Sequence, residues 1–273
     1  METPLYEWGS REKPTLLCLH GMGSSGLSFG EFAHFLTDQF HVLAVDLPGH
    51  GKNQYGEEDE AFLPSRLAKR IRKTIDSAGK PIYLAGHSWG AHITLYAAHA
   101  YPELLKGMIL LDGGYLQQTD LPEGGSLQKE LENAEAFYEA VRFPSWDSFI
   151  ESEKAEWPRW SEELEVASKA QVKEKDGEIR LAAEPPAIRA VLKGVYAEPI
   201  TEGLSDMKIP LLLLRSTLPV DLEGIRQTAS ARLQTEVPEA TVHAVKDTTH
   251  DIYRDAPKET AEYIKKWVRQ LES

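Results

Sequence analysis

The chain of 273 residues contains one cysteine and is 27% charged and 41% hydrophobic, as expected for a globular protein with a full core. A small secreted module held together by disulfides is therefore excluded. The 43 acidic and 30 basic residues give a formal charge of −13, which would repel a nucleic-acid backbone. Residues 1–14 lack the apolar run of a signal sequence, so we expect a cytoplasmic protein without a membrane anchor.

Short apolar runs alternate with longer segments of helical spacing in the first half of the chain. The expected strands are residues 15–19, 41–45, 81–85 and 107–111. Apolar residues recur every three or four positions at 29–36 and at 63–75, which predicts one amphipathic helix in each segment. Because parallel strands need such crossover helices, the pattern predicts an α/β fold with a mostly parallel, doubly wound sheet.

The alternation stops near residue 113 and returns at residue 209. The returning pattern predicts strands at 210–214 and 241–245, and helices at 222–237 and 257–271. Residues 1–114 and 206–273 are therefore expected to form the core domain. Residues 115–205 have mainly helical patterning and are expected to form an inserted helical cap, since the segment is too long for a loop.

The insertion carries much of the surplus negative charge, with 19 acidic and 10 basic residues. These charges indicate either solvated helix faces or a negative lid that disfavours anionic substrates. Its aromatic residues Trp146, Phe149, Trp157 and Trp160 are candidates for the wall of an apolar substrate pocket. The alternative is that they form the insertion's own core.

A serine occupies the centre of a Gly-x-Ser-x-Gly pattern at residues 86–90, between a predicted strand and a predicted helix. The glycines allow the close packing of a sharp, strained turn that exposes the Ser88 hydroxyl at the end of the sheet. We therefore predict that Ser88 is a nucleophile; the alternative is an unreactive turn serine. A glycine-containing loop at residues 20–25 follows an earlier strand, and we assign the oxyanion-binding amides to Met22 and Trp89.

These motifs, together with a turn at residues 46–51 and a late histidine, resemble the α/β-hydrolase family, specifically its capped serine esterases and lipase-like members. The resemblance covers essentially the whole chain and implies the α/β-hydrolase fold with a Ser-acid-His triad in that order. Family members often carry an extra N-terminal strand pair. Here there is room for one strand, at residues 5–8.

His250 is the predicted base, because it follows the last expected strand and directly precedes the final helix. Two residues are candidates for the acid of the triad. Asp112 ends the expected strand at 107–111, which is the position of the acid in the haloalkane dehalogenase and zearalenone lactonase branches of the family. Asp221 follows the strand at 210–214 but also resembles a helix N-cap. We prefer Asp112 and keep Asp221 as the alternative.

The expected function is hydrolysis of carboxylic esters, or lactones, of small and largely apolar substrates. A carbon-carbon bond hydrolase, or a small-molecule receptor that keeps the triad, is the alternative. No metal or cofactor is expected, because no Cys or His cluster has zinc spacing and the loop at 21–23 lacks a dinucleotide fingerprint. The expected partner is therefore a small-molecule ester or lactone, and the oligomeric state is left open.

Overall fold

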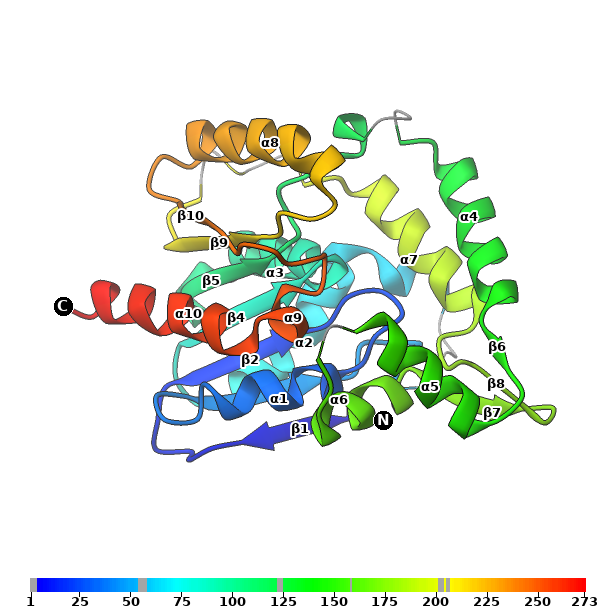
Figure 1. The fold of residues 1–273 in the computed structure, drawn as a ribbon. Coiled ribbons are helices and arrows are strands. Elements are labelled where there is room, and N and C mark those ends of the chain that lie inside the picture. The colour runs from blue at the N-terminus through cyan, green and yellow to red at the C-terminus, as the bar shows by residue number, and fades with distance from the viewer. Residues whose placement is uncertain (1–3, 54–57, 122–124, 158, 201–203, 205–206) are drawn as a thin grey trace.

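The computed structural model describes residues 4–53, 58–121, 125–157, 159–200, 204 and 207–273. A seven-stranded sheet lies at its centre (Figure 1). In spatial order the strands are β1 (Leu5–Trp8), β3 (His41–Val45), β2 (Thr15–Leu19), β4 (Ile82–His87), β5 (Leu105–Leu111), β9 (Leu211–Arg215) and β10 (Thr241–Ala244). Strand β1 is antiparallel to β3 and every other neighbouring pair is parallel. The predicted mostly parallel sheet is confirmed, including its single N-terminal strand.

Helices cover both faces of this sheet. One apolar cluster joins the sheet to α1 (Gly30–His34), α9 (Ile252–Asp255) and α10 (Pro257–Leu271). The other joins it to α2 (Pro64–Ser77), α3 (Trp89–Ala100) and α8 (Glu223–Glu236). The central strands are buried along their length, as expected for a sheet with helices on both faces. None of the helices in the described ranges is long and apolar enough to cross a membrane.

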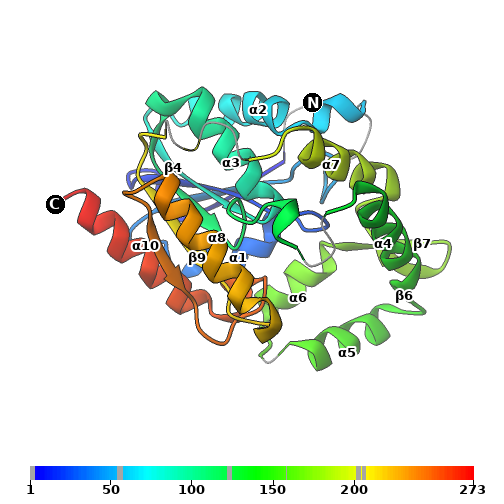
Figure 2. The same cartoon turned by 90° about the horizontal axis from the view of Figure 1, so that it is seen from above.

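The segment between β5 and β9 contains α4 (Leu127–Ala140), α5 (Trp146–Glu156), α6 (Glu162–Lys169) and α7 (Pro185–Ala197). Figure 1 and Figure 2 both show α4 and α5 to one side of the sheet. Short 3-10 helices occur at Gly26–Phe29, Asp59–Phe62, Pro102–Leu104, Gln118–Asp120 and Val220–Leu222. The expected boundary between residues 205 and 206 lies outside the described residues.

The insertion also contains a small antiparallel sheet, which the expected helical cap did not include. Its strands lie in the order β6 (Arg142–Phe143), β8 (Glu178–Leu181) and β7 (Val172–Lys175). Asp176 and Gly177 connect β7 to β8 with φ angles of 54° and 79°. Positive φ at both central residues is typical of the Asp-Gly hairpin turn, which favours this sheet over a helix.

Helix α3 packs unusually close to the sheet because two glycines face each other across its first turn. A Cβ at Gly86 would overlap the carbonyl group of Gly90, and a Cβ at Gly90 would overlap the carbonyl of Leu19. Both obstacles are backbone atoms that cannot rotate away. These glycines therefore fix the distance between α3 and the strands that precede it.

We expect Gly90→Ala to lower the free energy of unfolding by about 1–3 kcal/mol, because the added methyl group overpacks this contact. The measurement is urea denaturation followed by circular dichroism. Gly224→Ala is the matched control, since a Cβ at Gly224 in α8 meets no atom within 4 Å. Equal stability of the two variants would contradict the close-packing argument.

Candidate active site

Ser88 lies at the junction between β4 and α3 in a strained backbone conformation. Its φ and ψ angles are 52° and −115°, a region that residues other than glycine rarely adopt. Its amide donates to the carbonyl oxygen of Leu111 at 3.2 Å, which ties the turn to the end of β5. Ser88 is partly exposed while His87 and Trp89 are buried. This is the geometry of a nucleophile elbow.

Asp112 lies at the end of β5, is 3% exposed, and accepts four hydrogen bonds. The amide and hydroxyl of Ser216 each donate at 2.8 Å, and the Tyr115 hydroxyl donates at 3.2 Å. His250 Nδ1 lies 2.8 Å from the second carboxylate oxygen. Asp221 is instead exposed within the short 3-10 helix at Val220–Leu222. The structure therefore places Asp112, rather than Asp221, beside His250.

The Asp112–His250 contact determines the protonation of both groups. Burial opposes the imidazolium, but the hydrogen bond and the negative charge of Asp112 outweigh it, so the pKa of His250 is raised above 6.5. Burial likewise opposes the carboxylate, but His250 and the two Ser216 donors outweigh it, so the pKa of Asp112 is lowered. Asp112 therefore remains ionised at neutral pH and favours the tautomer with a proton on Nδ1.

His87 holds the backbone of His250 in place. Its Nε2 donates to the His250 carbonyl oxygen at 2.9 Å, and the two ring centroids are 4.7 Å apart. Burial lowers the pKa of His87 to about 4, so this imidazole is neutral at physiological pH. His87 thus fixes the loop that carries His250 without adding positive charge beside it.

Ser88 and His250 line two cavities in common. The Ser88 cavity has a volume of about 430 Å³ and is closed by α4 and α7 of the insertion, with Phe137, Tyr138, Ile188 and Leu192 as apolar lining residues. The α7 cavity has a volume of about 270 Å³ and extends to Val191 and Val195. The sequence alone did not identify these lining residues. Their helical spacing was the available signal, but it does not show which helix face meets the sheet.

The two candidate oxyanion donors come from different elements next to Ser88. Met22 lies in the loop after β2 and lines both cavities. This loop approaches the elbow so closely that a Cβ on Gly21 would lie 3.2 Å from the Cβ of Ser88. Trp89 is the first residue of α3, where backbone amides have no acceptor within the helix. The arrangement is suited to binding negative charge that develops next to Ser88.

The four aromatic residues proposed for the pocket wall lie elsewhere. Among the described residues that line the Ser88 and α7 cavities, none is Trp146, Phe149, Trp157 or Trp160. Phe149 is buried and packs against Trp146, consistent with a role in the insertion's own core. Phe149 and Trp157 line a third space of about 660 Å³, the aromatic cavity.

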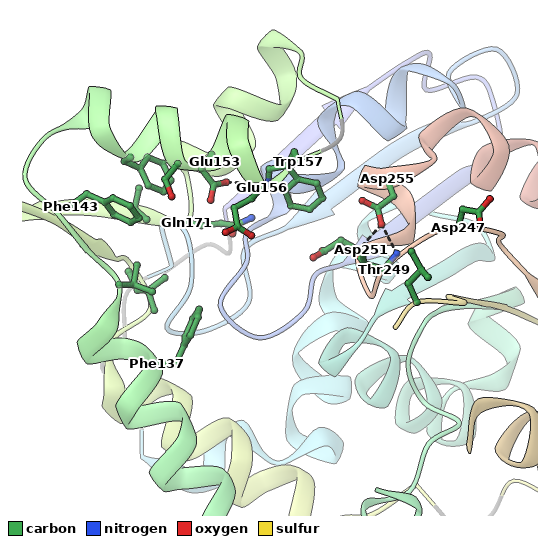
Figure 3. A pocket seen from close by; sticks show the side chains of 16 residues that line it. Phe137, Phe143, Glu153, Glu156, Trp157, Gln171, Asp247, Thr249, Asp251 and Asp255 are labelled. Carbon is green, nitrogen blue, oxygen red and sulfur yellow. Dashed lines mark hydrogen bonds between the residues drawn. The ribbon is translucent and has the colours of Figure 1, made fainter. Parts of the chain in front are cut away.

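The aromatic cavity adjoins the Ser88 cavity, since Phe137, Gln171, Leu181 and Asp251 line both. Figure 3 shows Phe137 and Phe143 on one side of it and Asp251 and Asp255 on the other. No lysine, arginine or histidine occurs among its described lining residues. In the parts of the chain that the structure describes, no group of three or more His, Cys, Asp or Glu side chains is arranged to hold a metal ion.

Comparison with known proteins identifies the family. Residues 16–263 match the family model described as "Alpha/beta hydrolase family". The chain belongs to the α/β-hydrolase family. This membership confirms the resemblance and the fold expected from the sequence.

Several relatives of this α/β-hydrolase align over nearly the whole chain. The (E)-2-((N-methylformamido)methylene)succinate hydrolase of Acinetobacter baylyi is 26% identical over 267 residues, which cover 96% of this chain and 92% of the relative. The 2-(acetamidomethylene)succinate hydrolase of Mesorhizobium japonicum is 24% identical, covering 94% of this chain and 90% of the relative.

Solved structures agree on the fold. A crystal structure of E-2-(acetamidomethylene)succinate hydrolase has a TM-score of 0.79 at 21% identity and covers 98% of this chain and 95% of its own. A thioesterase domain from the curacin biosynthetic pathway has a TM-score of 0.74 at 22% identity, with coverages of 96% and 94%. At these identities the likeness shows the α/β-hydrolase fold alone.

We expect Asp112→Asn to lower kcat for p-nitrophenyl butyrate by at least several hundredfold, because the imidazole loses the carboxylate that orients it. Steady-state kinetics of the purified variants provide the measurement. Asp221→Asn is the matched control and should stay within about threefold of the wild type, since surface substitutions rarely disturb distant groups. The reverse ranking would identify Asp221 as the orienting acid.

The dependence of kcat/KM on pH tests the Asp112–His250 contact separately. A base must be neutral, so kcat/KM should rise with pH through a midpoint above 6.5, the ordinary value from which the pKa of His250 is raised. Asp112→Asn removes the charge that raises this pKa while burial still lowers it, so the midpoint should move to lower pH. An unchanged midpoint would show that Asp112 does not control His250.

Proposed function

We propose that this α/β-hydrolase is a serine hydrolase that cleaves carboxylic esters, including lactones, of small substrates through an acyl-enzyme on Ser88. The observation that carries the proposal is the contact of 2.8 Å between the buried Asp112 and His250 Nδ1, with Ser88 and His250 in the wall of one cavity. The strained elbow supports it, because such strain persists where the surrounding structure maintains it for function.

In the proposed reaction, Ser88 Oγ attacks the ester carbonyl carbon while His250 Nε2 accepts the hydroxyl proton. Asp112 keeps a proton on His250 Nδ1, which leaves a lone pair on Nε2. The amides of Met22 and Trp89 hold the tetrahedral oxyanion. Collapse of the intermediate breaks the bond to the alcohol, which leaves with the proton from His250.

Deacylation repeats the same chemistry with water. His250 removes a proton from a water molecule, which attacks the acyl-Ser88 carbonyl, and the second oxyanion occupies the same site. Collapse returns the proton to Ser88 Oγ and releases the carboxylic acid. Each of these steps uses groups of this chain, the substrate and water.

The relatives favour a second candidate within the same machinery. Two are named as hydrolases of substituted methylenesuccinates rather than of simple esters. The same base and oxyanion site could serve attack by Ser88, or by activated water, on a compound of that kind. They could also serve cleavage of a carbon-carbon bond beside a ketone. A substrate panel should therefore contain such compounds beside esters and lactones.

We expect Ser88→Ala to abolish labelling by a fluorophosphonate probe and to lower turnover of p-nitrophenyl butyrate by at least about 10⁴-fold, since the nucleophile is removed. Gel fluorescence and steady-state kinetics are the measurements. Ser77→Ala, an exposed serine at the end of α2, is the control and should behave as the wild type. Labelling of Ser88→Ala equal to that of the wild type would contradict the proposal. A single turnover by the wild type, without steady hydrolysis, would favour the receptor alternative.

A further inference from the structure

Arg254 is a buried cation in the wall of the Ser88 cavity. It lies on α9, four residues after His250, and is 4% exposed. It lines the cavity together with Ser88 and His250. Its guanidinium carbon lies 4.0 Å from the centroid of the Trp157 ring, and its Nη2 donates to the Ser168 hydroxyl at 3.0 Å. The reaction proposed above gives this residue no role.

The charge of Arg254 has no paired carboxylate. No Asp or Glu among the described residues forms an ion pair with it, and its buried Nε has no hydrogen-bond partner. Two other buried arginines are compensated more fully: Arg215 pairs with Glu223 at 2.8 Å, and Arg226, which also has no ion pair, donates to the carbonyl oxygens of Leu218 and Pro219. A buried charge is costly unless it is paired. Stacking on Trp157 offsets only part of that cost.

We propose that Arg254 binds a carboxylate of the substrate, so that the protein selects acyl compounds that carry a second, anionic group. The guanidinium presents a planar set of donors that matches the two oxygens of a carboxylate. Because Arg254 and Ser88 line one cavity, a short substrate can contact both residues. This inference rests on the proposed function for the reacting bond, and names the class of compound that would be cleaved.

Nearby carboxylates oppose the binding of an anion to different degrees. Glu130 and Asp251 line the same cavity, and Glu153, Glu156, Asp247, Asp251 and Asp255 line the adjoining aromatic cavity. Glu156 and Asp247 are exposed to water, whereas Arg254 is buried. At equal distance, a Coulomb interaction at an effective dielectric constant of ~20 is about fourfold stronger than in water at ~80. A direct contact with Arg254 therefore outweighs repulsion from Glu156 and Asp247, whereas Glu130 and Asp251 are partly buried in the cavity itself and oppose an anionic substrate more strongly.

The first test compares two esters that differ only at one end. p-Nitrophenyl hemisuccinate ends in a carboxylate where p-nitrophenyl butyrate ends in a methyl group. We expect a wild-type kcat/KM at least about tenfold higher for the hemisuccinate, since the buried donors of Arg254 would be left unpaired by the methyl group. Equal values, or a preference for the cationic p-nitrophenyl 4-aminobutyrate, would overturn the proposal.

Substitutions of Arg254 test whether this residue causes the preference for the hemisuccinate over the butyrate ester. Arg254→Gln should lower the ratio of the two kcat/KM values by at least about tenfold, because the hemisuccinate loses its contact with the guanidinium. Arg254→Lys should give an intermediate ratio, because it keeps the charge but not the fork of donors. Arg269→Gln, on the last turn of α10, removes the same charge outside the cavity and should leave the ratio unchanged. A role limited to tethering α9 to Trp157 and Ser168 would lower stability without changing the ratio.

A binding measurement separates this inference from the proposed reaction. Calorimetric titration of the Ser88→Ala protein with succinate should show binding, and the Ser88→Ala/Arg254→Gln protein should bind at least about tenfold more weakly. Succinate binding through Arg254 without ester turnover by the wild type would support the inference and contradict the proposed reaction. Steady ester hydrolysis without Arg254-dependent binding would overturn the inference and leave the reaction standing. If Arg254→Gln fails to fold, the wild-type ester ratio and the Arg254→Lys protein decide the question.

Discussion

The candidate site depends on one contact, the hydrogen bond between the buried carboxylate of Asp112 and the half-exposed imidazole of His250. Burying a carboxylate is unfavourable unless donors replace its water, and Ser216 and Tyr115 supply those donors beside the imidazole. Ser216 directly follows β9, and the Asp112 amide donates to the Leu214 carbonyl oxygen of that strand at 2.8 Å. The parallel register of β5 and β9 thus brings together residues that are 104 positions apart in the chain. The pairing of β5 with β9 therefore positions the donors that keep the Asp112 carboxylate ionised.

The insertion supplies part of the cavity walls and contacts the core through buried apolar residues and through polar pairs. Apolar residues of α7, including Ala187, Ala190 and Val191, belong to the main hydrophobic core. The polar links vary in exposure: Lys193 pairs with Asp59 at 2.6 Å with both side chains about half exposed, whereas the Arg159–Glu31 pair is largely buried. Exposed pairs contribute little, whereas buried apolar surface contributes most of the attachment. Helix α7 is therefore a part of the cavity wall that packs firmly against the hydrophobic core.

The sequence predicted those features that local patterns encode. The strands at residues 15–19 and 41–45, and the last helix, agree with the observed elements to the residue. Ser88 and His250 could be named because each follows a strand in a recognisable local context. The pairing of His250 with Asp112 could not be derived, since Asp112 and Asp221 each follow a strand and only their burial and distance separate them.

The cavity that the aromatic residues Phe149 and Trp157 line could not be predicted for the same reason. Phe149 and Trp157 sit at suitable positions in the sequence, but the cavity face of an insertion depends on how its helices pack, which periodicity does not determine. The small sheet at residues 142–181 was encoded locally, in the Asp176-Gly177 pair. Its signal was overlooked because the flanking strands are only four residues long and highly charged.

Residues 249–255 carry both the proposed base, His250, and the arginine proposed to bind the substrate carboxylate, Arg254. The Asp255 carboxylate accepts hydrogen bonds from the Thr249 amide at 2.6 Å and from its hydroxyl at 2.7 Å, which fastens α9 to the loop before it. His250 and Arg254 both lie between Thr249 and Asp255, so the backbone fixes the separation of these two residues, while Trp157 and Ser168 of the insertion position the guanidinium. A carboxylate held by Arg254 would therefore be held at a constant distance from the base. Binding energy released there can orient the reacting carbonyl toward Ser88, which is how contacts remote from the reacting bond lower an activation barrier.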